Sequence, residues 1–331
     1  MEYPYYENYV TKKEIKENFK KLQTLPSILI KPRREDCRIQ MAVKTDQLSK
    51  ITDYFSEKCR AQCSFKNKPP PIEKFKKLQN NPIFREGGYI EIEQFLYDNA
   101  RGCNNFDVKV VLSVLRYFKP KRMLDFSAGW GDRLIGAMAY GCEYDGVDPS
   151  ECLHPKYQEM ISTLLPPSKR GKYRVFKTGF EDFQIPSTPF TSSKGSGSKK
   201  KGGYMNSKKK GEEKKYDLVF TSPPFFDLEV YENEKSQSIS KFNTLEKWKQ
   251  NFLFPAMEKS VSVLEMNGHL VIYVSDYTTE SGKRIQYVRD MKRKVRQLGM
   301  TYQGNICFSN VDDLNRVRVI YVWKKLTSFS S

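Results

Sequence analysis

The sequence predicts an α/β fold in which helices cover both faces of a mostly parallel sheet. From about residue 105, short apolar runs alternate with helical stretches, the rhythm typical of such a sheet. The last two runs, 302–308 and 317–324, follow each other without a helix between them, which predicts a terminal antiparallel hairpin. Hydrophobic residues make up 38% of the chain, so a sizeable core can form.

The expected elements follow one another along the chain. Strands are predicted at 123–126, 144–148, 173–179, 216–221, 269–275 and 318–323. Helices are predicted at 106–118, 131–141, 152–164, 244–264 and 283–298. Two earlier segments, 11–25 and 45–63, place apolar residues at helical spacing and predict a small helical N-terminal region. We therefore divide the chain into a basic helical region, 1–100, and a second domain, 101–330.

The chain is strongly basic, with 57 Lys and Arg, 39 Asp and Glu, and a formal net charge of +18. The excess gathers in two places, residues 1–80 and the segment 191–216. The segment 191–216 consists largely of Lys, Gly and Ser, a composition that predicts a disordered insertion. Clustered positive charge is typical of proteins that bind a polyanion such as nucleic acid, although solubility alone would also account for it.

The opening of the chain lacks a basic segment followed by an apolar one, so no secretory signal is expected. Apolar runs are too short to span a bilayer, which predicts an intracellular protein without membrane contact. Seven cysteines, odd in number and widely spread, indicate buried free thiols rather than a disulfide framework. Cys59 and Cys63 are the one close pair, and the two histidines do not complete a ligand set, so no metal is expected.

The first motif that carries chemistry is MLDFSAGWGDRL, residues 123–134. A short apolar strand ends at Asp125, and Ser127, Gly129 and Gly131 lead directly into a helix. Glycines at such a turn let a ligand approach the backbone, and the carboxylate can hold a cationic or hydroxyl group. Alone the motif is weak, because glycine-rich turns at strand ends are common.

Acidic residues end the next two strands. Asp148 closes YDGVD at a position suited to a ribose diol, although Asp-Pro-Ser also suits the start of a helix. Glu181 and Asp182 follow the third strand beside Phe180, where a carboxylate and an aromatic ring can hold an adenine. Either NAD or S-adenosylmethionine fits these groups. The three-glycine pattern of dinucleotide enzymes is missing, which disfavours NAD.

The most specific motif is the turn that follows the strand YDLVFT. Ser222, Pro223, Pro224 and Phe225 come where a parallel sheet holds its ligands. Two prolines stiffen the backbone and remove two N–H donors, which leaves a turn rich in acceptors. An exocyclic amino group needs such acceptors, because hydrogen bonds to its N–H groups push the nitrogen towards sp³, and Phe225 offers a face for the base. The alternative, a proline-rich surface turn, does not explain why the motif ends an apolar strand.

The order of these motifs resembles the class I S-adenosylmethionine-dependent methyltransferases. DFSAGWG, the VD strand end, the acidic third strand end and TSPPFF are similar to the branch that methylates exocyclic amines of adenine or cytosine in nucleic acid. The resemblance covers about residues 105–325 and implies a Rossmann-like fold with S-adenosylmethionine as cofactor. The family's loop often reads D-P-F-x-G-x-G, and here Phe126 and Ser127 depart from that pattern.

The resemblance implies a role for each motif. In the cofactor site, the methionine end would be held by the loop that contains Asp125, Ser127, Gly129 and Gly131. Asp148 would bind the ribose, and Glu181 or Asp182 would bind the adenine. In the catalytic site, Ser222, Pro223, Pro224 and Phe225 would hold the target base. We call these four residues the tetrad. No recognition domain follows the tetrad, so we assign recognition to the N-terminal region and the basic insertion.

The predicted function is N-methylation of adenine N6 or cytosine N4 in nucleic acid, with DNA favoured over RNA. In a duplex, the base would have to be flipped out of the stack. The alternatives are an RNA adenine N6 methyltransferase, a catalytically inactive nucleic-acid-binding subunit of the same fold, and a methyltransferase for a protein or small-molecule amine. The sequence is also compatible with a protein partner.

Overall fold

The computed structural model describes residues 2–66, 68–100, 102–186, 215–231 and 235–326. The insertion predicted at 191–216 lies outside the described residues up to residue 214. Its last residue, Tyr216, belongs to the core instead, because it begins a strand and its hydroxyl donates a hydrogen bond to Asp145 Oδ2 at 2.7 Å.

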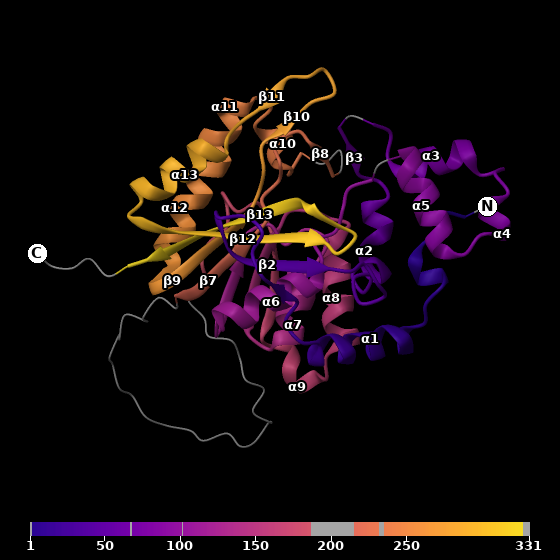
Figure 1. Ribbon diagram of the computed structural model, residues 1–331, viewed down its shortest axis with the longest axis horizontal. Helices are drawn as coiled ribbons and strands as arrows, with labels where there is room; N and C mark the ends of the chain where they lie inside the picture. Colours follow the sequence, from indigo (N-terminus) through magenta and orange to yellow (C-terminus); the bar gives the residue numbers. More distant parts are fainter. Residues whose placement is uncertain (1, 67, 101, 187–214, 232–234, 327–331) are drawn as a thin grey trace, which may run out of the picture.

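A nine-stranded mixed sheet forms the centre of the molecule, with the strand order β1-β2-β12-β13-β9-β7-β4-β5-β6 (Figure 1). Its strands are β1 (Leu29–Ile30), β2 (Cys37–Val43), β4 (Arg122–Asp125), β5 (Glu143–Asp148), β6 (Tyr173–Lys177), β7 (Tyr216–Thr221), β9 (Leu264–Tyr273), β12 (Met300–Asn310) and β13 (Asp313–Lys325). The pairs β4–β5, β5–β6, β4–β7, β7–β9 and β2–β12 are parallel. Strand β13 runs antiparallel to both β9 and β12, which confirms the predicted terminal hairpin.

Helices cover both faces of this sheet (Figure 1). One face carries α6 (Val108–Phe118), α7 (Asp132–Tyr140) and α8 (Leu153–Leu164), with α1 (Lys12–Thr24) packed against α7 and α8. The other face carries α11 (Leu245–Trp248), η2 (Lys249–Leu253), α12 (Phe254–Val263) and α13 (Val288–Gln297). In the described part of the chain, no helix is both long and apolar enough to cross a membrane.

The remaining elements surround the sheet. They are η1 (Tyr6–Asn8), α2 (Asp53–Arg60), α3 (Pro71–Leu78), α4 (Ile83–Glu86), α5 (Tyr89–Ala100), α9 (Pro167–Arg170) and α10 (Ser238–Lys241), with the two-residue strands β3 (Ser64–Phe65), β8 (Glu229–Val230), β10 (Tyr277–Thr278) and β11 (Arg284–Ile285). The N-terminal helices α3, α4 and α5 lie together beyond one end of the sheet (Figure 1). Tyr3, Phe75, Ile92 and Leu96 form a small core of their own there.

The sheet contains two strands that the sequence analysis did not predict. β2 pairs in parallel with β12, and β1 pairs with β2, so part of the predicted N-terminal region extends the main sheet. The helix expected at 45–63 is also shorter, because Asp46 Oδ1 accepts the N–H groups of Leu48 and Ser49 and holds residues 46–49 in a turn. The division at residue 100 stays a prediction, and the region is not purely helical.

The expectation of free cysteines is wrong for six of the seven. Disulfides join Cys37 to Cys307, Cys59 to Cys152 and Cys63 to Cys103, and Cys142 is buried as a free thiol. The pairs are separated by 270, 93 and 40 residues, so each depends on tertiary contacts that cysteine spacing does not reveal. The first disulfide ties β2 to β12, and the second ties α2 to the start of α8.

Candidate functional site

The predicted site residues gather at one edge of the sheet. Because β4, β5, β6 and β7 are parallel, their carboxyl ends meet, and this edge is called the carboxyl edge below. Asp125 and Asp148 are the last residues of β4 and β5. Glu181 follows β6 and Ser222 follows β7 directly. The fold therefore places the three acidic positions and the tetrad at the edge where parallel sheets hold ligands.

The glycine loop between β4 and α7 has two different glycines. Gly131 has φ +97°, and a Cβ added to it would stand 2.6 Å from Met160 Sδ, so this position serves close packing against α8. Gly129 has φ +56°, and an added Cβ would meet no atom closer than 3.7 Å. An added Cβ would thus be in ordinary van der Waals contact with Ser127 and Arg133, so the left-handed φ rather than crowding is what favours glycine here. Of the two glycines, this one is better suited to contact a cofactor.

Asp125 is fully buried and bonded within the protein. Its Oδ2 accepts hydrogen bonds from Arg133 Nε at 2.8 Å and from the Tyr144 hydroxyl at 2.9 Å, while Oδ1 accepts the Ser127 N–H at 3.3 Å. Arg133 also donates to the Ser127 carbonyl oxygen, so the guanidinium ties the loop to the end of β4. This geometry favours a role for Asp125 in shaping the loop, with Arg133 as a partner that sequence reasoning missed.

Asp148 holds the glycine loop from the neighbouring strand. Its Oδ2 accepts the Gly129 N–H at 2.8 Å, and its Oδ1 accepts the Ser150 N–H at 3.0 Å. The side chain is almost fully buried, and this burial raises the pKa of Asp148 to about 6, although the two backbone hydrogen bonds act in the opposite direction. The carboxylate thus lies against the Gly129 backbone at the carboxyl edge, and each of its oxygens accepts one backbone N–H.

Of the two acidic residues after β6, Glu181 is the better placed. Its Oε1 pairs with Lys241 Nζ at 2.7 Å, while its Oε2 is buried without a hydrogen-bond partner among the described residues. An orphaned buried acceptor is costly unless a ligand satisfies it. Asp182 also pairs with Lys241, at 3.0 Å, but its side chain is 67% exposed. Phe180 stacks on Phe126 at 4.8 Å in the core and offers no free face.

The tetrad leaves β7 as a constrained turn. The Leu228 N–H donates to the Phe225 carbonyl oxygen at 3.0 Å, and Phe226 adopts φ +54°, a left-handed conformation that costs an aromatic residue about 1–3 kcal/mol. Burial of Phe226 against Trp248 compensates for this strain. Phe225 contacts a different residue, Tyr273, with ring centroids 5.8 Å apart. The two neighbouring aromatic rings of the turn therefore point to different sides.

The acceptors of the tetrad are available. Among the described residues, the Ser222 hydroxyl and the carbonyl oxygens of Pro223 and Pro224 take part in no hydrogen bond. Ser222 and Pro224 are partly exposed, so a ligand at the carboxyl edge can reach the turn. The structure thus places several free oxygen acceptors beside one aromatic ring, an arrangement suited to an amino group on a flat base.

Residues after the tetrad connect it to the glycine loop and to the N-terminal region. Tyr231 contacts Trp130 of the loop, with ring centroids 5.6 Å apart. β8 pairs with β3, and the Lys66 N–H donates to the Leu228 carbonyl oxygen at 2.8 Å. The sequence analysis did not predict these contacts. The one signal for them is Trp130, a large aromatic residue between Gly129 and Gly131 that needs a packing partner. These contacts set the distance between the cofactor loop and the tetrad.

Comparison with solved structures finds methyltransferases among the matches, all at low identity and with TM-scores below 0.5. TrmN from Thermus thermophilus is 12% identical with a TM-score of 0.40, and the match covers 67% of this chain and 49% of TrmN, about half its length. A methyltransferase from Burkholderia thailandensis with bound S-adenosylhomocysteine is 11% identical, with a TM-score of 0.41 over 78% of this chain and 91% of that one. An RNA methyltransferase candidate from Pyrococcus horikoshii is 14% identical, with a TM-score of 0.37 over 66% and 83%. No family model and no curated protein sequence matches the chain.

The strand order, with β13 antiparallel to both of its neighbours, is that of a Rossmann-like sheet, as the sequence analysis expects. Identities below 15% say nothing about its substrate, so the chemistry has to be argued from its own residues. Two of them suit the S-adenosylmethionine that the sequence analysis expects: the Asp148 carboxylate beside Gly129, and the Oε2 of Glu181, which has no partner among the described residues. Among the described residues, no group of three or more acidic, His or Cys side chains is arranged to hold a metal ion.

Proposed function

We propose that this protein is an S-adenosylmethionine-dependent N-methyltransferase that acts on an exocyclic amine of adenine or cytosine in nucleic acid, with DNA favoured over RNA. The observation that carries the proposal is the turn Ser222–Phe225, whose oxygen acceptors are free and which leaves the carboxyl edge beside the glycine loop. A surface turn without function would not need free acceptors between a buried strand and a strained aromatic residue.

S-adenosylmethionine supplies a methyl group activated by a sulfonium. For this cofactor, Asp148 would accept hydrogen bonds from the ribose hydroxyls, and Glu181 Oε2 would accept one from the adenine amino group. The loop at Gly129 would face the methionine end, while Asp125, Ser127 and Gly131 keep the loop in shape through the Arg133 contacts and the packing on α8. Of these groups, Glu181 Oε2 has no partner among the described residues, whereas the Asp148 oxygens would accept the ribose hydroxyls in addition to their backbone N–H groups.

The tetrad residues would act on the target base. The Ser222 hydroxyl and the carbonyl oxygens of the proline turn accept hydrogen bonds from the amino N–H groups, which localises the nitrogen lone pair for attack. Phe225 stacks on the base and fixes its plane, and its own position is set by Tyr273. The prolines keep the turn rigid, so the acceptors need little reorganisation as positive charge develops on nitrogen.

The charge distribution supports a nucleic-acid substrate. The net charge of +18 is far more than a small-molecule substrate requires, and much of it lies in residues 1–80. Exposed basic side chains also flank the carboxyl edge, from Lys283 and Arg284 of the β10–β11 hairpin to Arg316 and Arg318 of β13. Such groups would bind phosphates on either side of a base that enters at Phe225.

The experiment that tests the proposal identifies the methylated nucleoside. The full chain is incubated with labelled S-adenosylmethionine and with DNA or RNA oligonucleotides, the products are digested, and the nucleosides are separated by mass spectrometry. Label in N6-methyladenosine or N4-methylcytidine, in the deoxy or ribo form, supports the proposal. Label in RNA alone would replace DNA by RNA as the substrate, whereas cofactor binding with no transfer to either polymer would indicate an inactive subunit.

A further inference from the structure

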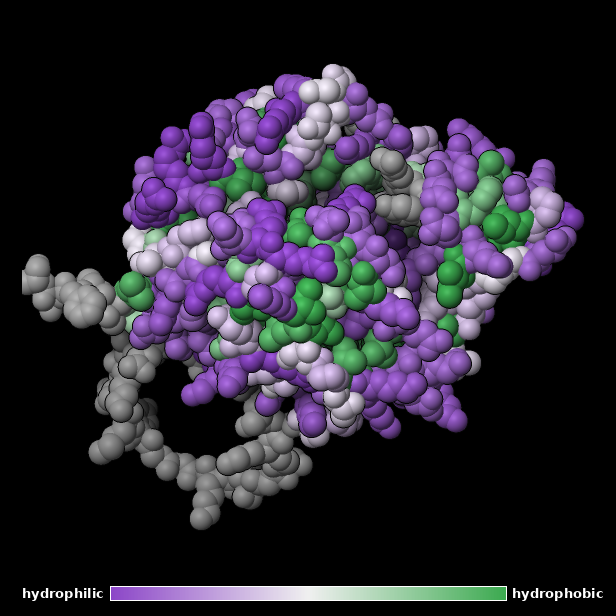
Figure 2. Space-filling model, viewed as in Figure 1, coloured by the Kyte–Doolittle hydropathy of each residue, from purple (hydrophilic) through white to green (hydrophobic). Residues whose placement is uncertain are grey.

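A large cavity opens at the same edge of the sheet, beyond the site described above. Its volume is about 1460 Å³, and it lies where β2 and β12 end, because it is lined by Val43 and by residues from Phe308 to Asn310. β12 is parallel to β9, since both run antiparallel to β13, so this is the carboxyl edge again. The hollow between the central body and helices α3–α5 is visible in Figure 2. We call it the polar cavity.

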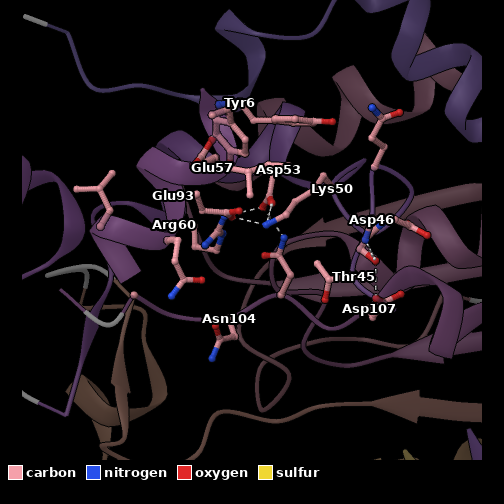
Figure 3. Close-up of a pocket in the computed structure, with 18 of the residues that line it drawn as sticks. Tyr6, Thr45, Asp46, Lys50, Asp53, Glu57, Arg60, Glu93, Asn104 and Asp107 are labelled. Atoms are coloured by element: carbon pink, nitrogen blue, oxygen red, sulfur yellow. Dashed lines mark hydrogen bonds and ion pairs between the residues drawn. The ribbon is translucent and has the colours of Figure 1, made fainter. Parts of the chain in front are cut away.

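Four charged side chains in the wall of the polar cavity are paired with one another. Lys50 pairs with Asp53 and Glu93, and Arg60 Nη2 pairs with Asp53 Oδ1 at 2.6 Å (Figure 3). Glu57 accepts the Tyr6 N–H, and burial raises the pKa of Glu57 to about 7, so this carboxyl is partly protonated near neutral pH. In the whole lining, acidic residues outnumber basic ones by eight to four, so the cavity does not draw a phosphate inside.

Aromatic and amide groups give the polar cavity its other surfaces. Tyr6 and Tyr9 each contact Tyr89, with ring centroids 4.9 and 5.3 Å apart, and the Tyr9 side chain is 45% exposed. Asn104 lines the space with an amide that has no partner among the described residues (Figure 3). Tyrosine faces can stack on bases, and a free amide can read a base edge. The cavity therefore suits bases better than a sugar-phosphate chain.

The polar cavity is connected to the target-base turn by aromatic contacts. Phe308 in its lining contacts Tyr273 at 5.5 Å, and Tyr273 contacts Phe225 at 5.8 Å. Arg316 and Arg318 line the cavity from β13, both are exposed, and neither forms an ion pair with another described residue. Arg318 lies over the Phe308 ring at 5.7 Å, and both guanidinium groups can bind a phosphate at the mouth of the cavity.

We infer that the polar cavity receives unpaired bases adjacent to the target base, so that the substrate is single-stranded or locally opened nucleic acid. The inference rests on the proposed function and deepens it by naming the state of the substrate and the surface that reads its neighbours. The volume exceeds the 300–1,000 Å³ or so of a pocket for one small ligand, so it can hold more than one base. Bases that remain paired in a duplex cannot present their faces to Tyr9.

The test measures binding of fluorescein-labelled single-stranded oligonucleotides by anisotropy, with an abasic nucleotide placed in turn at the target and at each flanking position. For the unmodified protein, loss of one flanking base weakens binding about tenfold, the size expected for one stacked base. Tyr9→Ala shows the same loss with the intact oligonucleotide and no further loss with the abasic one. The matched control is Tyr117→Ala, which removes a tyrosine of similar exposure on α6 outside the cavity and leaves binding unchanged.

A second pair of variants tests the arginines. Arg316→Ala with Arg318→Ala lowers the salt dependence of binding, whereas Arg289→Ala with Arg296→Ala on α13 removes the same charge away from the cavity and has a smaller effect. Binding that is insensitive to flanking bases and to Tyr9→Ala overturns the inference, even if methyl transfer occurs. Competition by a lysine-rich peptide that is itself methylated also overturns it. Binding that depends on Tyr9 without transfer to any oligonucleotide contradicts the proposed function and leaves the cavity assignment standing.

Discussion

Replacement of Asp148 by alanine removes the carboxylate that we assign to the ribose of the cofactor. In the structure, Asp148 also accepts two backbone N–H groups, from Gly129 at 2.8 Å and from Ser150 at 3.0 Å. The loss of hydrogen bonds to a charged group costs roughly 1.5–3 kcal/mol, so the dissociation constant for S-adenosylmethionine should rise by about 10- to 150-fold. Asp148→Asn keeps one acceptor for the loop and serves as the control for loop shape.

The pH dependence follows from the same residue. Burial raises the pKa of Asp148 from 3.8 to about 6, so a falling pH protonates the carboxyl and removes an acceptor. Cofactor affinity should therefore be full above pH 7 and decline as the pH drops through about 6. The contribution of Asp148 to stability changes in the opposite direction: the folded state binds this proton more tightly, so stability falls by about 3 kcal/mol as the pH rises from about 4 to 6.

Isothermal titration calorimetry measures the affinity for S-adenosylmethionine and therefore tests both the effect of the substitutions and the pH dependence of cofactor binding. The unmodified protein and the two variants are titrated between pH 5 and 8, and circular dichroism confirms that each variant is folded. The expected result is a weaker and pH-independent binding in Asp148→Asn and a further loss in Asp148→Ala. Unchanged affinity in a folded Asp148→Ala protein would assign the ribose to another group.

Three further predictions concern the core, the insertion and the cysteines. Arg133→Met leaves the buried Asp125 carboxylate without its ion-pair partner and should destabilise the fold by about 3–5 kcal/mol in urea unfolding; a change below 1 kcal/mol would mean that the pair is not buried as described. Deletion of residues 191–214, which spares Tyr216, should change stability by less than about 1 kcal/mol and flatten the salt dependence of nucleic-acid binding, and an unfolded product would contradict the view of this segment as an insertion. Thiol titration of the denatured, unreduced protein should find one thiol, that of Cys142, whereas seven would exclude the disulfides.

Local sequence patterns predicted the central sheet well. β7 begins and ends at the expected residues, because an apolar run that is buried in a parallel sheet is followed directly by Ser-Pro-Pro. β2 was missed because Cys37–Val43 is a short run with mixed burial at one side of the sheet, and only its pairing with β12 reveals it. Elements that depend on distant partners were thus the ones that local periodicity could not show.

The candidate site was predicted in part for a similar reason. The acidic strand ends and the tetrad are visible because residue type and strand position coincide. The sequence does not show which carboxylates already have hydrogen-bond partners in the folded protein. Arg133 donates to Asp125, whereas Glu181 keeps one oxygen without a partner among the described residues. The polar cavity depends on the N-terminal segment folding over the ends of β2 and β12, and no motif in the sequence marks that contact.

The central claim is that the tetrad performs chemistry on a target base, and single-turnover methyl transfer in Ser222→Ala and Phe225→Ala tests it most directly. Phe225→Ala removes a stacking surface worth about 1–3 kcal/mol per base. Ser222→Ala removes an acceptor that matters most as the nitrogen becomes positively charged, so turnover should fall more than substrate affinity. We predict that both variants bind S-adenosylmethionine with nearly unchanged affinity and transfer its methyl group to an oligonucleotide at strongly reduced rates. Unreduced transfer rates in both variants would contradict the assignment of an amino-methyltransferase.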